Sequence, residues 1–302
     1  MKIRKIAVFM SGPSRYVDLV HRNLEQRLSG VAVDYFYHLW TEDLGNKIRG
    51  GYSADLSYIL AHPSTKVMVH HKPYSLDFYR GRFGVHVNTH STANAIIGMF
   101  LGISQLCAIF SQLPDRGEYS HILRIRTDCV ILNSGFWELL QSHADSVLVS
   151  SDSATPPKGW VCDHMMFAPA SLFLNVYRFN AIDEVYDAIE RGQRNPEKTL
   201  FEMLKERVSA SHQVVGSLTR YVDYQIVYSP PRKTDSAWMR ALIDAGRMRE
   251  LFLETDTFRR LDEDLACVMD QSENWRPTGD PYGNKFKNKL SVLVRRIKGL
   301  FL

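Results

Sequence analysis

The chain has 302 residues, of which 45% are hydrophobic and 23% are charged; this is typical of globular proteins and excludes collagen-like, mucin-like and generally disordered chains. Four scattered cysteines without a CxxC pair exclude a disulfide scaffold, argue against a structural zinc site and favour the reducing cytoplasm. The net charge of +4 is small and no nucleic-acid-binding module is recognisable, so we expect no nucleic-acid partner.

Strand and helix patterns alternate through the first half of the chain. Runs of apolar, β-branched and aromatic residues predict strands at residues 5–10, 31–39, 66–70, 121–125 and 146–150. Apolar residues at helical spacing predict helices at residues 16–28, 56–60, 92–112 and 136–142. This alternation predicts an α/β, Rossmann-like fold with a mostly parallel central sheet.

Two apolar segments could be mistaken for targeting or membrane signals. Residues 6–10 follow a basic start but are too short for a signal-peptide core, and a strand that ends in a turn at residues 11–13 explains them better. Residues 93–110 carry no charge but include polar Asn94 and Gln105, so we expect a buried helix and not a membrane span.

Helix patterns dominate the second half of the chain. They predict helices at residues 171–189, 196–207, 237–253 and 257–269, followed by a linker with Pro and Gly at residues 276–284. We therefore expect a helical extension over residues 209–284.

The last residues, 285–302, have a composition of their own. They contain six Lys and Arg residues and no acid, so +4 for the chain and +6 for this segment leave −2 for the remainder. Apolar residues recur in it at helical spacing, which predicts a basic amphipathic helix. Such a helix binds anionic membrane surfaces, and we favour this interpretation over a helix that packs on the rest of the protein.

The first predicted strand ends in the sequence FMSGPSR, residues 9–15. A strand that turns into a helix presents backbone N–H groups to an anion, so Ser11, Gly12 and Arg15 are candidates for holding a phosphate. The sequence is neither a P-loop nor GxGxxG. The alternative is a tight turn with a surface arginine.

The strand predicted at residues 121–125 belongs to the sequence ILRIRTD. Ligands of parallel sheets bind at the carboxyl ends of strands, so Asp128 is a candidate ligand of a divalent metal or a sugar hydroxyl. Arg124 and Arg126 are candidates for holding a diphosphate or for orienting Asp128. The alternative is an Arg–Asp ion pair that closes the strand.

A third group of polar residues lies in GWVCDHMMFAP, residues 159–169. Asp163 beside His164 offers a general base or a metal ligand, and the alternative for His164 is a half-buried structural histidine. Trp160 is a candidate for stacking on a sugar or nucleobase, or for the core. Farther on, Pro196 and Glu197 are typical of the first turn of a helix.

The order of these motifs resembles GT-A-type bacterial glycosyltransferases of lipopolysaccharide and surface-polysaccharide assembly. Residues 5–208 carry, in order, FMSGPSR, YFYHLW, ILRIRTD, GWVCDHMMFAP and NPEKTLFEML. The resemblance implies a GT-A fold in which residues 1–208 form a nucleotide-sugar-binding and catalytic domain. The helical extension, 209–284, and the amphipathic tail, 285–302, would follow this domain.

The resemblance also implies roles for individual residues. Ser11, Gly12 and Arg15 would line the nucleotide, together with Arg124 and Arg126, while Asp128 would replace an acid of the DxD motif that binds Mn²⁺ or Mg²⁺. Asp163 would be the base that deprotonates the acceptor, with Glu197 as the second candidate, and Trp160 and His164 would lie on the acceptor side. The chain has one acid in Arg126-Thr127-Asp128 and not two, which leaves its need for a metal open.

These inferences combine into one expected activity and two alternatives. The expected activity is transfer of a sugar from a nucleotide-sugar donor to a lipid-linked glycan, at the inner face of the cytoplasmic membrane, to which residues 285–302 would bind. One alternative is a sulfotransferase-like enzyme that binds a phosphosulfate nucleotide at residues 11–15. The other is a non-catalytic, membrane-associated assembly protein that retains the fold.

Overall fold

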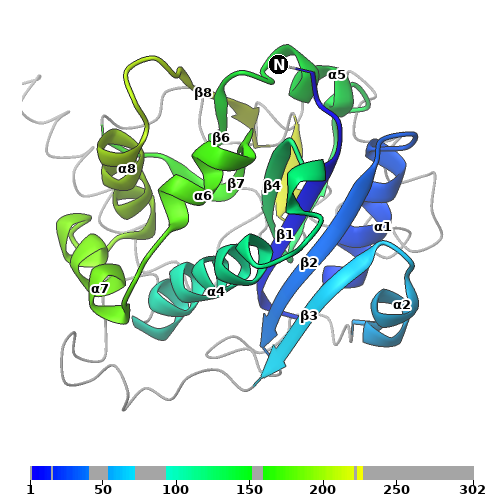
Figure 1. Cartoon of the computed structure of the whole chain (residues 1–302), viewed down its shortest axis with the longest axis horizontal. Helices are drawn as coiled ribbons and strands as arrows, with labels where there is room; N and C mark the ends of the chain where they lie inside the picture. Colours follow the sequence, from blue (N-terminus) through cyan, green and yellow to red (C-terminus); the bar gives the residue numbers. More distant parts are fainter. Residues whose placement is uncertain are drawn as a thin grey trace, which may run out of the picture. The chain divides into compact units, whose positions relative to one another are not determined.

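The computed structural model describes residues 2–14, 16–40, 54–71, 93–151, 159–220 and 223–226. Figure 1 shows how their helices and strands are arranged. The strands are β1 Ile6–Pro13, β2 Val33–Trp40, β3 Thr65–His71, β4 His121–Arg126, β5 Cys129–Ile131, β6 Val147–Ser151, β7 Cys162–Pro169, β8 Val214–Thr219 and β9 Tyr224–Ile226. The helices are α1 Val17–Arg27, α2 Leu56–Ala61, α4 Ala93–Ser111, the 3₁₀ helix η1 Arg116–Glu118, α5 Phe136–Ser142, α6 Ala170–Tyr177, α7 Ile182–Arg191 and α8 Pro196–Arg207.

Seven strands form one sheet in the order β3-β2-β1-β4-β7-β6-β8. β7 runs antiparallel to its neighbours β4 and β6, whereas the other neighbouring pairs of this sheet are parallel. Strands β5 and β9 form a separate antiparallel pair. The predicted α/β fold with a mostly parallel sheet is therefore confirmed.

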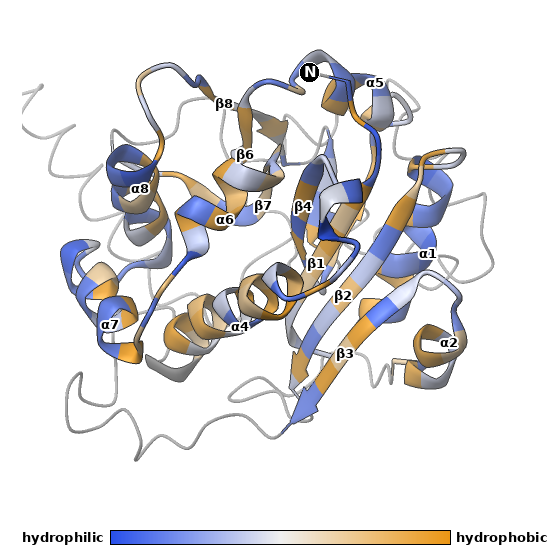
Figure 2. Ribbon diagram, viewed as in Figure 1, coloured by the Kyte–Doolittle hydropathy of each residue, from blue (hydrophilic) through white to orange (hydrophobic). Residues whose placement is uncertain are grey.

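Helices cover both faces of the sheet, with α4 on one face and α1 on the other (Figure 1). Alternate residues of β2 show the division, because successive side chains of a strand point to opposite faces. Phe36 belongs to the buried cluster beneath α4, while Tyr35 and Tyr37 stack with His21 of α1. Figure 2 shows α4 as largely hydrophobic and the visible part of α1 as largely hydrophilic, and the buried residues of α1 include the polar Asp18, His21 and Asn23.

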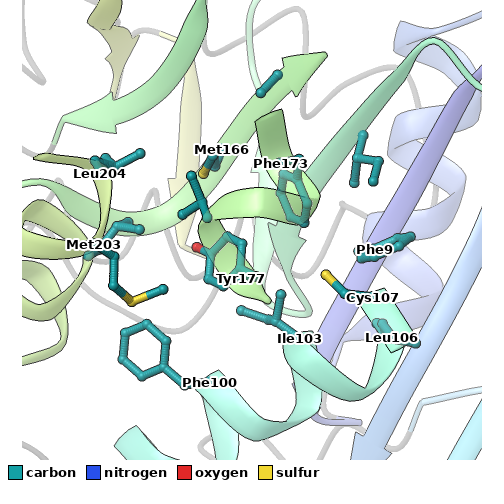
Figure 3. Close-up of a cluster of buried hydrophobic side chains, with 14 of the residues drawn as sticks. Phe9, Phe100, Ile103, Leu106, Cys107, Met166, Phe173, Tyr177, Met203 and Leu204 are labelled. Carbon is teal, nitrogen blue, oxygen red and sulfur yellow. The ribbon is translucent and has the colours of Figure 1, made fainter. Parts of the chain in front are cut away.

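The core between the sheet and helices α4 and α6 is rich in aromatic side chains (Figure 3). Phe9 of β1 packs edge-on against Phe110 and Phe173, with ring centroids 5.7 Å apart in both pairs. Tyr177 lies in the same cluster, with its ring 4.9 Å from that of Phe173. Edge-to-face pairs of this kind add to the stabilisation that burial provides.

Helix α4 approaches β2 closely through two glycines. A Cβ atom on Gly98 would lie 2.5 Å from Cζ2 of Trp40, and one on Gly102 would lie 2.8 Å from Nδ1 of His38. The segment expected to be a buried helix is thus confirmed as one. No helix among the described residues is long and apolar enough to cross a membrane.

The first strand is longer than predicted. β1 continues through Ser11, Gly12 and Pro13, where we expected a turn, because these residues pair with β2 in register and Ser11 also pairs with Arg126 of β4. Gly12 has φ of +134°, a backbone conformation that glycine adopts without strain.

The helix predicted over residues 171–189 is divided into α6 and α7. Residues 178–181 separate them, and the Asn180 backbone N–H donates to Oε2 of Glu184 at 3.0 Å. This contact satisfies a backbone group at the start of α7, so the second helix begins independently of the first.

The segment after residue 208 was expected to be helical, but its described part contains β8 and β9. β8 pairs with β6 and forms an edge of the large sheet. Strand β7 was also missed as a strand. The helices predicted at residues 237–253 and 257–269, the linker at 276–284 and the tail at 285–302 lie outside the described residues.

Candidate functional site

The candidate site lies at one edge of the large sheet, where the parallel strands β1, β4 and β6 end. The antiparallel strand β7 begins at the same edge, because Cys162 at its start is paired with Ser150 near the end of β6. Met165 of β7 is likewise paired with Ile125 near the end of β4. Open α/β sheets bind ligands outside the carboxyl ends of their strands, so this edge is the expected location of a site.

Two buried side chains near this edge carry hydrogen-bond donors that no described residue satisfies. Ser11 of β1 is opposite Arg126 of β4, and Phe9 is opposite Arg124, so Ser11, Arg124 and Arg126 share one face of the sheet. Ser11 is 4% exposed and Arg124 is 1% exposed. The Ser11 Oγ and the Arg124 Nε and Nη2 atoms have no hydrogen-bond partner within the part of the chain that the structure describes. Buried donors are nearly always paired in folded proteins, so this face of the sheet is a candidate for binding a ligand that has several acceptors.

Asp128 follows β4 and is held by Arg126 through both carboxylate oxygens. The Arg126 Nε and Nη2 atoms donate to Oδ1 and Oδ2 of Asp128, each at 3.0 Å. A bidentate ion pair of this kind fixes the orientation of the carboxylate and stabilises its negative charge. The structure therefore contains the Arg–Asp ion pair that the sequence offered as an alternative, and Arg126 orients Asp128.

Thr127, between these two residues, joins the ends of β1 and β4. Its Oγ1 donates to the Pro13 carbonyl at 2.6 Å. Gly12 lies directly beside it, since a Cβ atom there would be 3.7 Å from Thr127 Oγ1. The predicted donor-binding residues Ser11, Gly12, Arg126 and Asp128 are thus brought together, whereas Arg15 lies outside the described residues.

The described surroundings of Asp128 do not match the preference of Mn²⁺ or Mg²⁺ for several oxygen ligands. Both of its oxygens already accept bonds from Arg126. Among the described residues, two groups of His, Cys, Asp and Glu side chains have the spacing of metal ligands, and neither group includes Asp128. One group is Cys162, Asp163 and His164, and the other is His21, Glu25 and His62.

Asp163 and His164 lie together at the start of β7, and both are buried. The His164 Nε2 atom is 3.9 Å from Oδ1 of Asp163. On its other side, His164 Nδ1 lies 2.8 Å from the Tyr224 hydroxyl and 3.0 Å from Cys162 Sγ. Burial raises the pKa of Tyr224 well above its usual value, and the neighbouring Cys162 thiol adds to the increase. A neutral Tyr224 hydroxyl that donates to Nδ1 leaves the imidazole proton on Nε2, facing Asp163.

Tyr177 belongs to the core cluster between the sheet and α4. Burial of its hydroxyl raises its pKa, with Arg124 opposing the increase and Asp163 adding to it. Figure 3 shows this hydroxyl between Met166 and the α4 side chains.

Helix α8 brings Glu197 toward the start of β7. The Asn195 side chain accepts a bond from the Lys198 N–H at 2.9 Å and so begins the helix. The Glu197 carbonyl accepts a bond from the Val161 N–H at 3.3 Å, two residues before Asp163. Glu197 and Trp160 are both half-buried. The first turn of α8 thus lies beside the segment that carries Trp160.

Sequence reasoning missed two residues of this region, Tyr224 and Arg220. Arg220 follows β8, is 6% exposed, and its backbone N–H donates to the Ser151 carbonyl at the end of β6. Both residues were assigned to a helical segment. Residues 214–226 contain Val, Leu, Thr, Tyr and Ile in short runs, a composition typical of strands that could have identified them.

Comparisons with known proteins give similarities to solved structures and no match by sequence. No protein-family model matches the chain, and no curated protein matches it. Among solved structures, one from Desulfovibrio desulfuricans G20, described as a "putative nucleotide-diphospho-sugar transferase", superposes with a TM-score of 0.43. The two chains share 11% sequence identity, over 90% of this chain and 99% of the other. This similarity is too low to assign an activity to the chain.

Proposed function

We propose that this chain is a glycosyltransferase that transfers a sugar from a nucleotide-sugar donor to a glycan acceptor. The observation that carries the proposal is the set of unpartnered, buried donor atoms on Ser11 and Arg124, beside the ends of β1 and β4. Their chemistry fits an anion with several oxygen acceptors, and the diphosphate of a nucleotide sugar is such an anion. The order of the sequence motifs supports the same class of substrate.

In this proposal the arginines stabilise the leaving group. The bond between the anomeric carbon and the diphosphate oxygen breaks, so negative charge grows on the nucleoside diphosphate. Arg124 and Arg126 place positive charge at that end of the sheet, and Ser11 adds a hydroxyl donor. Donors that are already in position stabilise developing charge without reorganisation in the transition state. Asp128 fixes the Arg126 side chain.

Asp163 is the proposed base. It would accept the proton of the acceptor hydroxyl as that oxygen forms its bond to the anomeric carbon. His164, held by Tyr224, lies beside Asp163 and is a positioning residue. Glu197 is the second candidate for the base, and Trp160 is the candidate for stacking on the acceptor.

Steady-state assays of nucleoside diphosphate release test these roles. With a panel of nucleotide sugars, we expect Asp163→Asn to lower kcat by at least about a hundredfold, within the range of general base catalysis. Glu197→Gln is the matched comparison and should retain most of the activity. Loss of activity in Glu197→Gln alone would reverse the two assignments, and release by neither wild type nor variants would contradict the proposal.

We propose further that the acceptor is a lipid-linked glycan of surface-polysaccharide synthesis. The support is the predicted basic amphipathic helix at residues 285–302, which would hold the enzyme at the inner face of the cytoplasmic membrane. A chain shortened after residue 284 should no longer sediment with anionic vesicles and should lose activity on lipid-linked acceptors only. Sedimentation that persists in the shortened chain would overturn the membrane role of the tail.

Two alternatives keep specific support. The unpartnered donors of Ser11 and Arg124 would also fit the phosphates of a sulfotransferase nucleotide. The Arg126–Asp128 pair would also fit a non-catalytic protein, because it closes the strand without any ligand. Binding of adenosine 3′,5′-bisphosphate in preference to nucleoside diphosphates would favour the first. Cellular polysaccharide that is unchanged by Asp128→Ala would favour the second.

A further inference from the structure

A second group of polar side chains lies beneath the opposite face of the sheet, away from the candidate site. His21 and Glu25 are one turn apart on α1, so their side chains lie on the same side of that helix. His62 caps the end of α2 and reaches toward them. The nearest nitrogen and oxygen atoms of the three residues all lie within 4.8 Å of one another. We call these residues the α1–α2 cluster.

His21 is fully buried and its ring is fixed on two sides. The ring stacks on Tyr35, with centroids 4.1 Å apart, and its Nδ1 atom bonds to the Tyr37 hydroxyl. The Thr65 hydroxyl, at the start of β3, donates to the Ile59 carbonyl of α2 at 2.7 Å and joins these two elements. A cation on Nε2 would place the imidazole proton on Nδ1, which would then donate it to the Tyr37 hydroxyl.

The other ring nitrogen of His21, Nε2, faces an acid. It is buried, has no hydrogen-bond partner among the described residues, and lies 3.6 Å from Oε2 of Glu25. An imidazole nitrogen and a carboxylate oxygen that face each other in this way can bind one cation between them.

The rest of the α1–α2 cluster completes a ligand set. His62 Nε2 lies 2.6 Å from Oε1 of Glu25, and the Tyr58 hydroxyl donates to Oε2 of Glu25 at 2.7 Å. The His62 and Glu25 side chains are 17% and 32% exposed, so an ion can enter from solvent. Two imidazoles and a carboxylate are ligands that suit zinc, and a tyrosine that orients the carboxylate is typical of the groups around metal ligands.

We propose that His21, Glu25 and His62 bind a divalent cation of the zinc class, which clamps α1 to α2 and to the start of β3. The cation replaces the His62–Glu25 hydrogen bond and gives His21 Nε2 a partner, which it lacks among the described residues. It also requires the His62 proton to move to Nδ1, which breaks the 3.3 Å bond from the Ser64 N–H. This bond is at the long end of the hydrogen-bond range. The proposal does not depend on glycosyl transfer.

Titration of the purified, chelator-treated full chain with Zn²⁺ and Co²⁺ tests the proposal. We expect one equivalent to bind, with a rise in melting temperature and a Co²⁺ spectrum without sulfur-to-metal charge transfer. Glu25→Gln, which keeps the shape of the side chain, and His62→Gln should both lose this binding. Tyr37→Phe should weaken it by about 10- to 100-fold, because the group that orients His21 is removed.

Two control variants make the result specific. Glu206→Gln removes an acid on α8 whose side chain is 56% exposed and should bind like the wild type. Cys162→Ser removes the thiol of the second potential group of ligands and should also bind like the wild type. Circular dichroism of each metal-free variant establishes that it folds. Binding that is absent from the wild type, persists in both Glu25→Gln and His62→Gln, or disappears in Cys162→Ser would overturn the proposal.

Discussion

Arg124 sits in the interior of the protein, 1% exposed, on a strand between Phe9 and Met166. Its Nε and Nη2 atoms have no hydrogen-bond partner in residues 2–226 as far as the structure describes them. A buried charge without full compensation lowers stability, and an apolar side chain of similar length usually restores it. We interpret Arg124 as a ligand-binding residue whose buried charge lowers the stability of the ligand-free protein.

Arg124→Met should therefore separate stability from binding. We expect the free energy of unfolding to stay level or to rise by up to about 4 kcal/mol, while the affinity for a nucleoside diphosphate falls at least tenfold. Urea denaturation and calorimetric titration measure the two effects. Arg191→Met, at an exposed ion pair with Glu206, is the matched control and should change stability by no more than about 0.5 kcal/mol. A destabilised Arg124→Met variant that binds nucleotide normally would make Arg124 a structural residue.

Asp128→Asn should abolish transfer without unfolding the chain. Asparagine keeps one acceptor for Arg126 but removes the negative charge that holds its guanidinium at two points. Because Arg126 would then be positioned poorly, we expect kcat/KM to fall by about a hundredfold or more, with an unchanged circular dichroism spectrum. Normal turnover by this variant would remove Asp128 from the site.

At the scale of elements, the contact between α4 and β2 positions the core that supports β1 and β4. Gly98 is the closest point, since a Cβ atom there would meet Trp40 at 2.5 Å and 2.9 Å. Trp40 is 5% exposed and has little room to move. The YFYHLW sequence therefore has a packing role in this protein, because His38 and Trp40 both face α4.

Gly98→Ala should destabilise the protein although alanine favours helices. The gain in helix propensity is about 1 kcal/mol, whereas overpacking a close contact costs about 1 to 3 kcal/mol and rises when the neighbour cannot move. We expect a net loss in urea denaturation. Gly117→Ala is the control, because nothing lies within 4 Å of its added Cβ, and it should be neutral. Equal stability of the two variants would show that α4 shifts freely on β2.

The strands that the sequence predicted are those with β-branched and apolar runs, such as β2 and β4. β7 was missed because its sequence, CDHMMFAP, has no β-branched residue, and it is a strand because it pairs on both sides. The division of residues 171–189 into α6 and α7 depends on the Asn180–Glu184 contact, which apolar spacing does not encode.

The candidate site, too, could be predicted from the sequence only in those parts that do not depend on contacts between distant residues. Placing Asp128 at the end of a strand needed only the order of the sequence, because carboxyl ends of parallel strands share an edge. The partners of His164 could not be predicted, since Tyr224 is 60 residues away and reaches it through the β5–β9 pair. The absence of partners for Arg124 likewise appears only once the chain is folded.

At the scale of the whole molecule, buried histidines couple stability to pH. Burial lowers the pKa values of His21 and His38 to about 4, whereas the unfolded chain titrates near 6.5. The unfolded state therefore binds more protons between these values, so stability is complete above pH 6.5 and falls as the pH drops toward 4.

Between pH 7 and pH 5, we expect the free energy of unfolding to fall by about 2 kcal/mol for each of these two histidines. Most carboxylates stay ionised in this range, so they contribute little to the change. Urea denaturation in the presence of a chelator, at pH 7, 6 and 5, measures the effect without a bound metal. His21→Gln should reduce by about half the slope of the free energy of unfolding against pH. A free energy of unfolding that is constant from pH 7 to pH 5 would contradict the assignment of these residues as buried and neutral.

In the proposed function, the edge formed by β1 and β4 binds the diphosphate of a nucleotide sugar. The decisive experiment is a thermal-shift measurement with nucleoside diphosphates and nucleotide sugars, with and without Mn²⁺. A ligand at a hundredfold excess over its Kd stabilises the folded state by about 2.7 kcal/mol. We predict a shift with one class of nucleotide in the wild type, and a clearly smaller one in Arg124→Met at the same ligand concentration. No shift with any nucleoside diphosphate, or an equal shift in Arg124→Met, would contradict this binding site.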